Sequence, residues 1–132
     1  MKNLRGDIGA ARQILDEARE YRAQWIMKVA AGEVNIFDVI EAASQPYSEP
    51  LGKIRLESLL SLDPSMRRRW QGVLLYVAEH TYVGKRQLSI HKLNINWLLN
   101  PKASTRLDCF VEAYLTARRA SEPFADRFPW VY

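Results

Sequence analysis

Apolar residues recur every three or four positions along most of this chain, and residues that end helices separate one run from the next. The longest run predicts a helix over residues 8–31, with Gly32 as its C-terminal stop. A shorter helix is predicted over 36–43, capped at its start by Asn35. This spacing predicts an all-α fold that begins with a long N-terminal helix.

Prolines mark the later boundaries. The segment 44–52, with the sequence SQPYSEPLG, predicts a loop, and a short helix follows over 56–62. Asp63 and Pro64 then provide an acceptor and a proline for the start of a longer helix over 65–79. After a turn at Gly84, helices are predicted over 94–99 and 102–119, so we expect five to six helices in all.

The chain carries a weak internal repeat. Residues 53–60 (KIRLESLL) are similar to residues 92–99 (KLNINWLL), and each is followed by a proline and a long helix containing arginine. Two copies of a unit made of a short helix, a tight turn and a long helix would explain the similarity. Chance likeness between leucine-rich helices is the alternative.

Length and composition favour one cytoplasmic domain over residues 1–132. The single cysteine, Cys109, excludes an internal disulfide, and no run approaches the roughly 20 apolar residues that span a bilayer. The start of the chain lacks the apolar run of a signal peptide. The last eleven residues are rich in aromatic side chains, which we expect to fold back on the body or, alternatively, to dock a protein partner: Phe124, Phe128, Trp130 and Tyr132.

Charge is distributed unevenly. Between Gly32 and Gly52 every charged residue is acidic, whereas residues 53–119 contain 12 basic and 5 acidic residues. The densest basic stretch runs from Lys53 to Arg69, and Arg67–Arg69 fall near a predicted helix start, where cations oppose the helix dipole. An anion such as a phosphate would relieve this repulsion. The alternative is that these arginines are merely solvated.

Residues with catalytic or metal-binding chemistry are sparse. His80, His91 and Cys109 show no ligand spacing, and no phosphate loop or nucleophile motif occurs. Cys109 is expected to be a small core residue, and the carboxylates are scattered over helix surfaces. We therefore expect no metal, no cofactor and no enzymatic activity.

The residues from about Arg19 to Val77 resemble the actinobacterial integration host factor family of small helical nucleoid proteins. The resemblance is carried by a basic first helix, by Gly32, by the short helix 36–43, by the segment 52–62 (GKIRLESLLSL) and by Arg67–Arg69. It covers slightly under half of the chain. It implies a helix–two-turn–helix element, a nucleoid location, and sequence-tolerant binding of double-stranded DNA that bends or compacts the duplex.

The turn departs from the family pattern. The family has a glycine-bearing turn that brings the backbone close to a phosphate, whereas residues 62–66 here contain no glycine and add the negative charge of Asp63. Residues after about 79 lie outside the resemblance, which points to a divergent relative from a phage or mobile element. A second DNA-binding unit there would use Lys85, Arg86 and Lys92.

The leading hypothesis is therefore an architectural DNA-binding protein. Its candidate contact residues are Arg22, Lys28, Lys53, Arg55, Ser65, Arg67, Arg68, Arg69, Lys85, Arg86 and Lys92. The alternative is a protein–protein interaction module on the same scaffold that has lost DNA binding and pairs its arginines with an acidic partner. A nuclease is disfavoured because no cluster of carboxylates is evident for metal ions.

Overall fold

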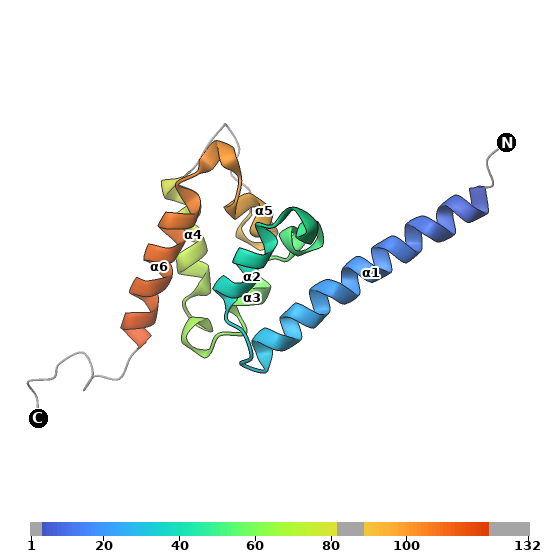
Figure 1. Cartoon of the computed structure of the whole chain (residues 1–132). Helices are drawn as coiled ribbons and strands as arrows, with labels where there is room; N and C mark the ends of the chain where they lie inside the picture. The colour runs from blue at the N-terminus through green and yellow to red at the C-terminus, as the bar shows by residue number, and fades with distance from the viewer. Residues whose placement is uncertain (1–3, 82–88, 122–132) are drawn as a thin grey trace, which may run out of the picture. The chain divides into compact units, whose positions relative to one another are not determined.

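The computed structural model describes residues 4–81 and 89–121, and within these ranges every regular element is a helix (Figure 1). The predicted all-α class is confirmed. The α-helices are α1 (Leu4–Ala30), α2 (Ile36–Ala43), α3 (Leu56–Leu60), α4 (Trp70–His80), α5 (Ile95–Leu98) and α6 (Arg106–Ser121). The 3-10 segments are η1 (Pro46–Lys53), η2 (Pro64–Met66), η3 (Ile90–Lys92) and η4 (Pro101–Ala103).

The chain divides into two compact units, Met1–Ile54 and Arg55–Tyr132, which we call unit 1 and unit 2. The expectation of one domain over the whole chain stays a prediction.

In unit 1, α1 ends as its sequence predicts. Gly32 adopts a φ of 76°, and its N–H and that of Glu33 donate to the carbonyl oxygens of Val29 and Lys28. This pair of bonds is a Schellman motif, which needs a residue that tolerates the left-handed conformation. The apolar stripe of α1 is only partly covered, because Trp25 and Val29 are half-buried whereas Ile8 and Leu15 are exposed.

The start of α2 is also as predicted. Asn35 Oδ1 accepts from the N–H of Asp38, and the Asp38 carboxylate accepts from the N–H of Asn35, which forms a capping box. The helix buries Ile36, Val39 and Ile40. The segment predicted as a loop differs: residues 46–53 form η1, which packs on α2 and buries Leu51. Pro46 fits this segment because it occupies the first turn, where its missing N–H is not needed.

Unit 2 contains the internal repeat, and the structure confirms it. Arg55 and Asn94 form an antiparallel bridge, and the N–H of Leu56 donates to the Leu93 carbonyl at 2.9 Å. From these residues each copy continues as a short helix, a proline turn and a long helix. The copies bury equivalent positions, in the pairs Leu56 and Ile95, Leu59 and Leu98, Met66 and Ala103, Val73 and Phe110, and Val77 and Tyr114.

The two proline turns share one construction. Side-chain oxygens of Asp63 and Asn100 accept from the N–H groups of Ser65 and Lys102, at 2.9 and 3.0 Å. Each following proline begins a short 3-10 segment, η2 or η4, rather than the long helix itself. The helices predicted to start at 65 and 102 therefore start later, because the acceptors cap the 3-10 turns and three or two residues then lead into α4 and α6.

The turn of the first copy is fastened to the long helix of the second. The Tyr114 hydroxyl donates to Asp63 Oδ2, while the N–H and hydroxyl of Ser65 donate to Oδ1. Burial, the largest single influence, raises the pKa of Asp63, but bonds from Tyr114 and Ser65 and the charge of Arg118 together hold it below its usual value. Burial and the Asp63 bond raise the pKa of Tyr114 to about 12.

Arg106 connects the long and short helices of the second copy, α6 and α5. It is 6% exposed, its Nη1 donates to the Trp97 carbonyl at 3.0 Å, and its guanidinium lies 4.2 Å from the centre of the Trp97 ring. Burial lowers the pKa of this guanidinium. Arg106 therefore joins α6 to the short helix α5 by a hydrogen bond and a cation–π contact.

Removing the Tyr114 hydroxyl should destabilise the protein. Tyr114→Phe keeps the ring but deletes the bond to the Asp63 carboxylate, so the free energy of unfolding should fall by about 1–3 kcal/mol in urea denaturation. Tyr76→Phe is the matched control, because Tyr76 is 42% exposed, and its effect should stay within about 0.5 kcal/mol. Equal stabilities of the two variants would contradict this role for Tyr114.

The raised pKa of Tyr114 also predicts a loss of stability in alkali. The folded state favours the protonated phenol, so this stabilisation is complete below pH 10 and is lost as the pH rises from 10 toward 12. Urea denaturation across this range should give a steeper decline for the unmodified chain than for Tyr114→Phe. Parallel declines would show that Tyr114 ionisation is not coupled to folding.

Candidate nucleic-acid interface

Five exposed arginines gather at one end of unit 2, and we call this group the arginine end. Arg67, Arg68 and Arg69 lie in the turn before α4, and Arg118 and Arg119 lie in the last turn of α6. The two groups meet where Arg69 Nη2 donates to the main-chain oxygen of Ala120 at 3.1 Å. This bond places the start of α4 beside the end of α6, so the two helices are antiparallel (Figure 1).

The sequence predicted only three of these five arginines as contact residues. Arg67–Arg69 were expected in the first two turns of a helix, but they precede α4, and Arg69 is its N-cap residue. The Arg69 side chain makes no capping hydrogen bond to α4. Arg118 and Arg119 were missed. Their signal was the basic last turn of a long helix, together with the repeat that makes α6 the partner of α4.

The charge of Asp63 is directed into the unit. Repulsion of a polyanion by this carboxylate stays a prediction, and its oxygens accept from Tyr114 and Ser65. Ser65 was a predicted contact residue, and its hydroxyl is committed to Asp63 at 2.7 Å, so it has no second O–H to give to a phosphate. The glycine-free turn at Asp63–Ser65 is therefore held by hydrogen bonds within the unit, and the exposed Arg67–Arg69 follow it in the chain.

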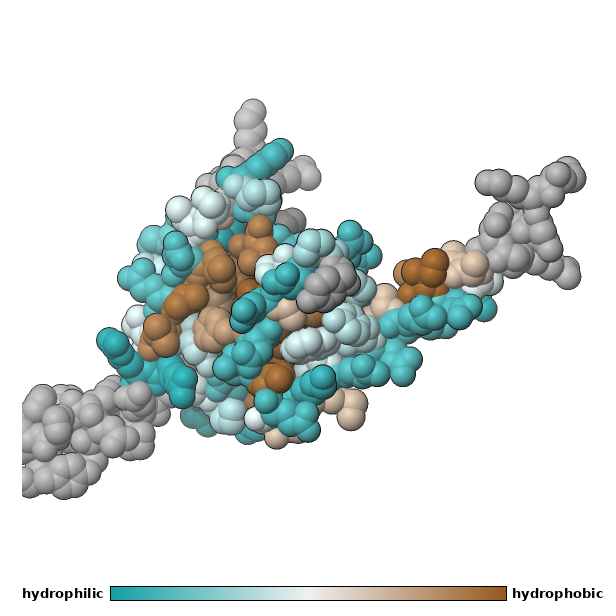
Figure 2. Space-filling model, viewed as in Figure 1, coloured by the Kyte–Doolittle hydropathy of each residue, from teal (hydrophilic) through white to brown (hydrophobic). Residues whose placement is uncertain are grey.

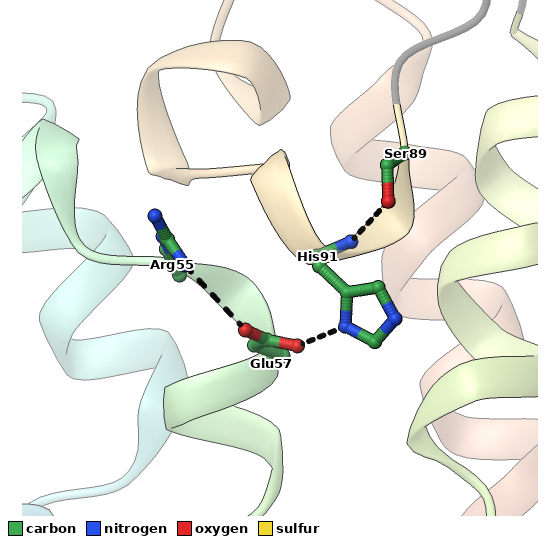
Figure 3. A network of polar contacts seen from close by, with 4 residues as sticks. All are labelled: Arg55, Glu57, Ser89 and His91. Carbon is green, nitrogen blue, oxygen red and sulfur yellow. Dashed lines mark hydrogen bonds and ion pairs between the residues drawn. The ribbon is translucent and has the colours of Figure 1, made fainter.

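A second polar group lies at the bridge between the two copies (Figure 3). Glu57 accepts from His91 Nδ1 at 2.7 Å and forms an ion pair with Arg55 at 3.9 Å, while Ser89 accepts from the His91 N–H. The predicted contact residue Lys92 follows His91 and is exposed. Because Glu57 offsets part of the positive charge, this group is less favourable to a polyanion than the arginine end.

The two groups are linked through the first residue of α4. The ring of Trp70 packs edge-on against His91, with 5.9 Å between ring centres, and Trp70 directly follows Arg69. Arg55 and Lys92 therefore belong to the same unit as the arginine end. Both lie near His91, because Arg55 shares the Glu57 carboxylate with His91 and Lys92 follows His91 in the chain.

The predicted contact residues of unit 1 are engaged differently. Arg22 is half-buried and donates from Nη1 to the Pro50 carbonyl at 3.4 Å, so part of its guanidinium ties α1 to η1. The Lys28 ammonium lies 5.1 Å from the centre of the Trp25 ring, and Lys53 is exposed. Lys85 and Arg86 lie outside the described residues, as do the aromatic residues at 124–132.

Other chemistry finds little support in the described ranges. No three His, Cys, Asp or Glu side chains in these ranges group as metal ligands, and no helix there is long and apolar enough to cross a membrane. Cys109 is half-buried rather than a full core residue. Burial and the nearby charge of Glu112 raise the pKa of its thiol, which disfavours the reactive thiolate.

Comparison of the chain with protein families, with curated proteins and with solved structures finds no match. The likeness to the integration host factor family therefore stays a prediction from the residues that carry it.

Proposed function

We propose that unit 2 binds the phosphate backbone of double-stranded DNA through the arginine end, with little sequence preference and without catalysis. The observation that carries the proposal is that two groups of arginines, distant in the sequence, meet at one end of the unit. The nearby Asp63 carboxylate is hydrogen-bonded to Tyr114 within the unit. Five guanidinium groups on one end of a small unit form a strong local positive potential.

The chemistry of these side chains suits phosphate. A guanidinium presents several N–H donors in a planar fork that matches the oxygens of a phosphate. Arg67 and Arg68 are exposed, and the bond from Arg69 Nη2 to Ala120 uses only one of the five N–H donors that a guanidinium carries. Contacts of this kind position a protein on a duplex without reading its bases. Bending or compaction of DNA is the outcome that the family resemblance adds to the proposal.

A protein-interaction module is the second candidate. It is favoured by the first half of α1, where large apolar side chains are exposed: Ile8 by 60%, Ile14 by 66% and Leu15 by 52%. Apolar side chains that form a contiguous exposed patch mark protein–protein interaction sites. Both candidates use the charges of the arginine end, so direct binding to DNA is the measurement that separates them.

The first test is the salt dependence of binding to a short duplex. Five phosphate contacts predict that the logarithm of the association constant falls against the logarithm of salt concentration with a slope of about −4.5. Arg67→Ala combined with Arg68→Ala should weaken binding on the order of ten- to a hundredfold and reduce the slope by about 2.

A double variant with the same loss of charge elsewhere is the control. Arg12 on α1 and Lys102 in the turn of the second copy are both exposed, and replacing them with alanine also removes two positive charges. This variant should bind within about threefold of the unmodified chain if the contacts are local. Equal losses in the two double variants would show only a general charge effect. Absence of binding by the unmodified chain at low salt would reject the proposal.

A further inference from the structure

An open groove runs between α4 and α6 in unit 2. Its volume is about 510 Å³, and its apolar lining comes from Gly72 and Val73 on one helix and from Ala113, Ala117 and Ala120 on the other. Arg68 and Arg69 lie at the end next to Ala120. Figure 2 shows apolar residues gathered in a band over α4 and α6, with hydrophilic residues around it.

Small residues line part of the groove, with Gly72 on α4 and three alanines on α6, and Tyr76, Glu112 and Thr116 also line it. A Cβ built on Gly72 meets no heavy atom within 4 Å, so this glycine faces empty space rather than a close helix contact. A volume in this range is typical of pockets that hold a ligand with several rings. The groove is therefore suited to an apolar occupant.

We propose that the occupant is the segment 122–132 of the same chain, with its aromatic side chains in the groove. The segment begins where the groove ends, because Ala120 lines the groove and lies two residues before residue 122. Eleven extended residues reach roughly 36 Å. The groove wall from Ala113 to Ala120 is only about 10 Å long, since a helix rises 1.5 Å per residue. The segment is long enough to turn back and cover it.

The composition of the segment complements the groove. Four of its eleven residues are aromatic, at positions 124, 128, 130 and 132, and they match the apolar floor. Its two acidic residues, Glu122 and Asp126, outnumber its one basic residue, Arg127, and they match the positive charges of Arg68 and Arg69 in the groove lining. The same acids would repel a DNA phosphate, so the segment and DNA are expected to compete for these two arginines, a consequence that rests on the proposed function.

The test fills the groove and observes the segment by NMR in the full chain. Gly72→Leu places a side chain in the open space, and Gly9→Leu is the matched control, because Gly9 is also helical with no heavy atom within 4 Å of a built Cβ. In the unmodified chain and in Gly9→Leu, the Trp130 indole signal should differ from that of the isolated peptide 122–132. In Gly72→Leu it should move to the peptide position.

A reciprocal variant guards against a folding defect in Gly72→Leu. Phe128→Ser combined with Trp130→Ser should shift the backbone amide signals of Gly72 and Ala117 while leaving that of Gly9 unchanged. A Trp130 signal at the peptide position in the unmodified chain would overturn the proposal, as would unshifted Gly72 and Ala117 signals in the reciprocal variant. A displacement of Trp130 that disappears on dilution would place the segment of a second copy in the groove and also reject it. No DNA is present, so the outcome is independent of the proposed function.

Discussion

Each copy in unit 2 changes direction at a proline that follows an aspartate or asparagine, and the remaining packing of the unit depends on these two turns. The side-chain oxygen holds an amide two residues later, and the proline restricts the backbone at the next position. Short and long helices are thereby set at an angle, so that their apolar faces meet. The bridge between Arg55 and Asn94 then joins the two copies edge to edge.

The first turn has an additional role, because its acceptor is charged. Asn100 holds only its own turn in the contacts described, whereas Asp63 also accepts from Tyr114 on the helix of the other copy. A single carboxylate therefore fixes the position of η2 against α6. The same contact brings Arg67–Arg69 toward Arg118 and Arg119, so the arrangement of surface charge follows from an internal hydrogen bond.

Local patterns in the sequence predicted much of the fold. Helical spacing and Asn35 predicted α2, Gly32 predicted the end of α1, and the similarity of 53–60 to 92–99 predicted the two copies. The 3-10 segments were not predicted, because an acceptor followed by proline is also the pattern of an α-helix start. Whether such a turn continues into the helix is decided by packing that the local sequence does not contain.

The candidate interface was harder to predict for a related reason. Arg67–Arg69 are adjacent in sequence and visible as a cluster, but Arg118 and Arg119 are some fifty residues away. Their proximity depends on the antiparallel arrangement of α4 and α6, which is a long-range property. The bond between Asp63 and Tyr114 was not predicted for the same reason, since Tyr114 is equally distant along the chain.

Arg69 and Arg106 occupy the same position in the two copies, six residues after the aspartate or asparagine of the turn. One is exposed at the surface, and the other is buried against Trp97. The same position therefore stabilises the fold in the second copy and contributes an exposed positive charge in the first. Substitutions at Arg67 and Arg68 can then change the surface charge without removing the arginine that supports the scaffold, because that arginine is encoded elsewhere in the chain.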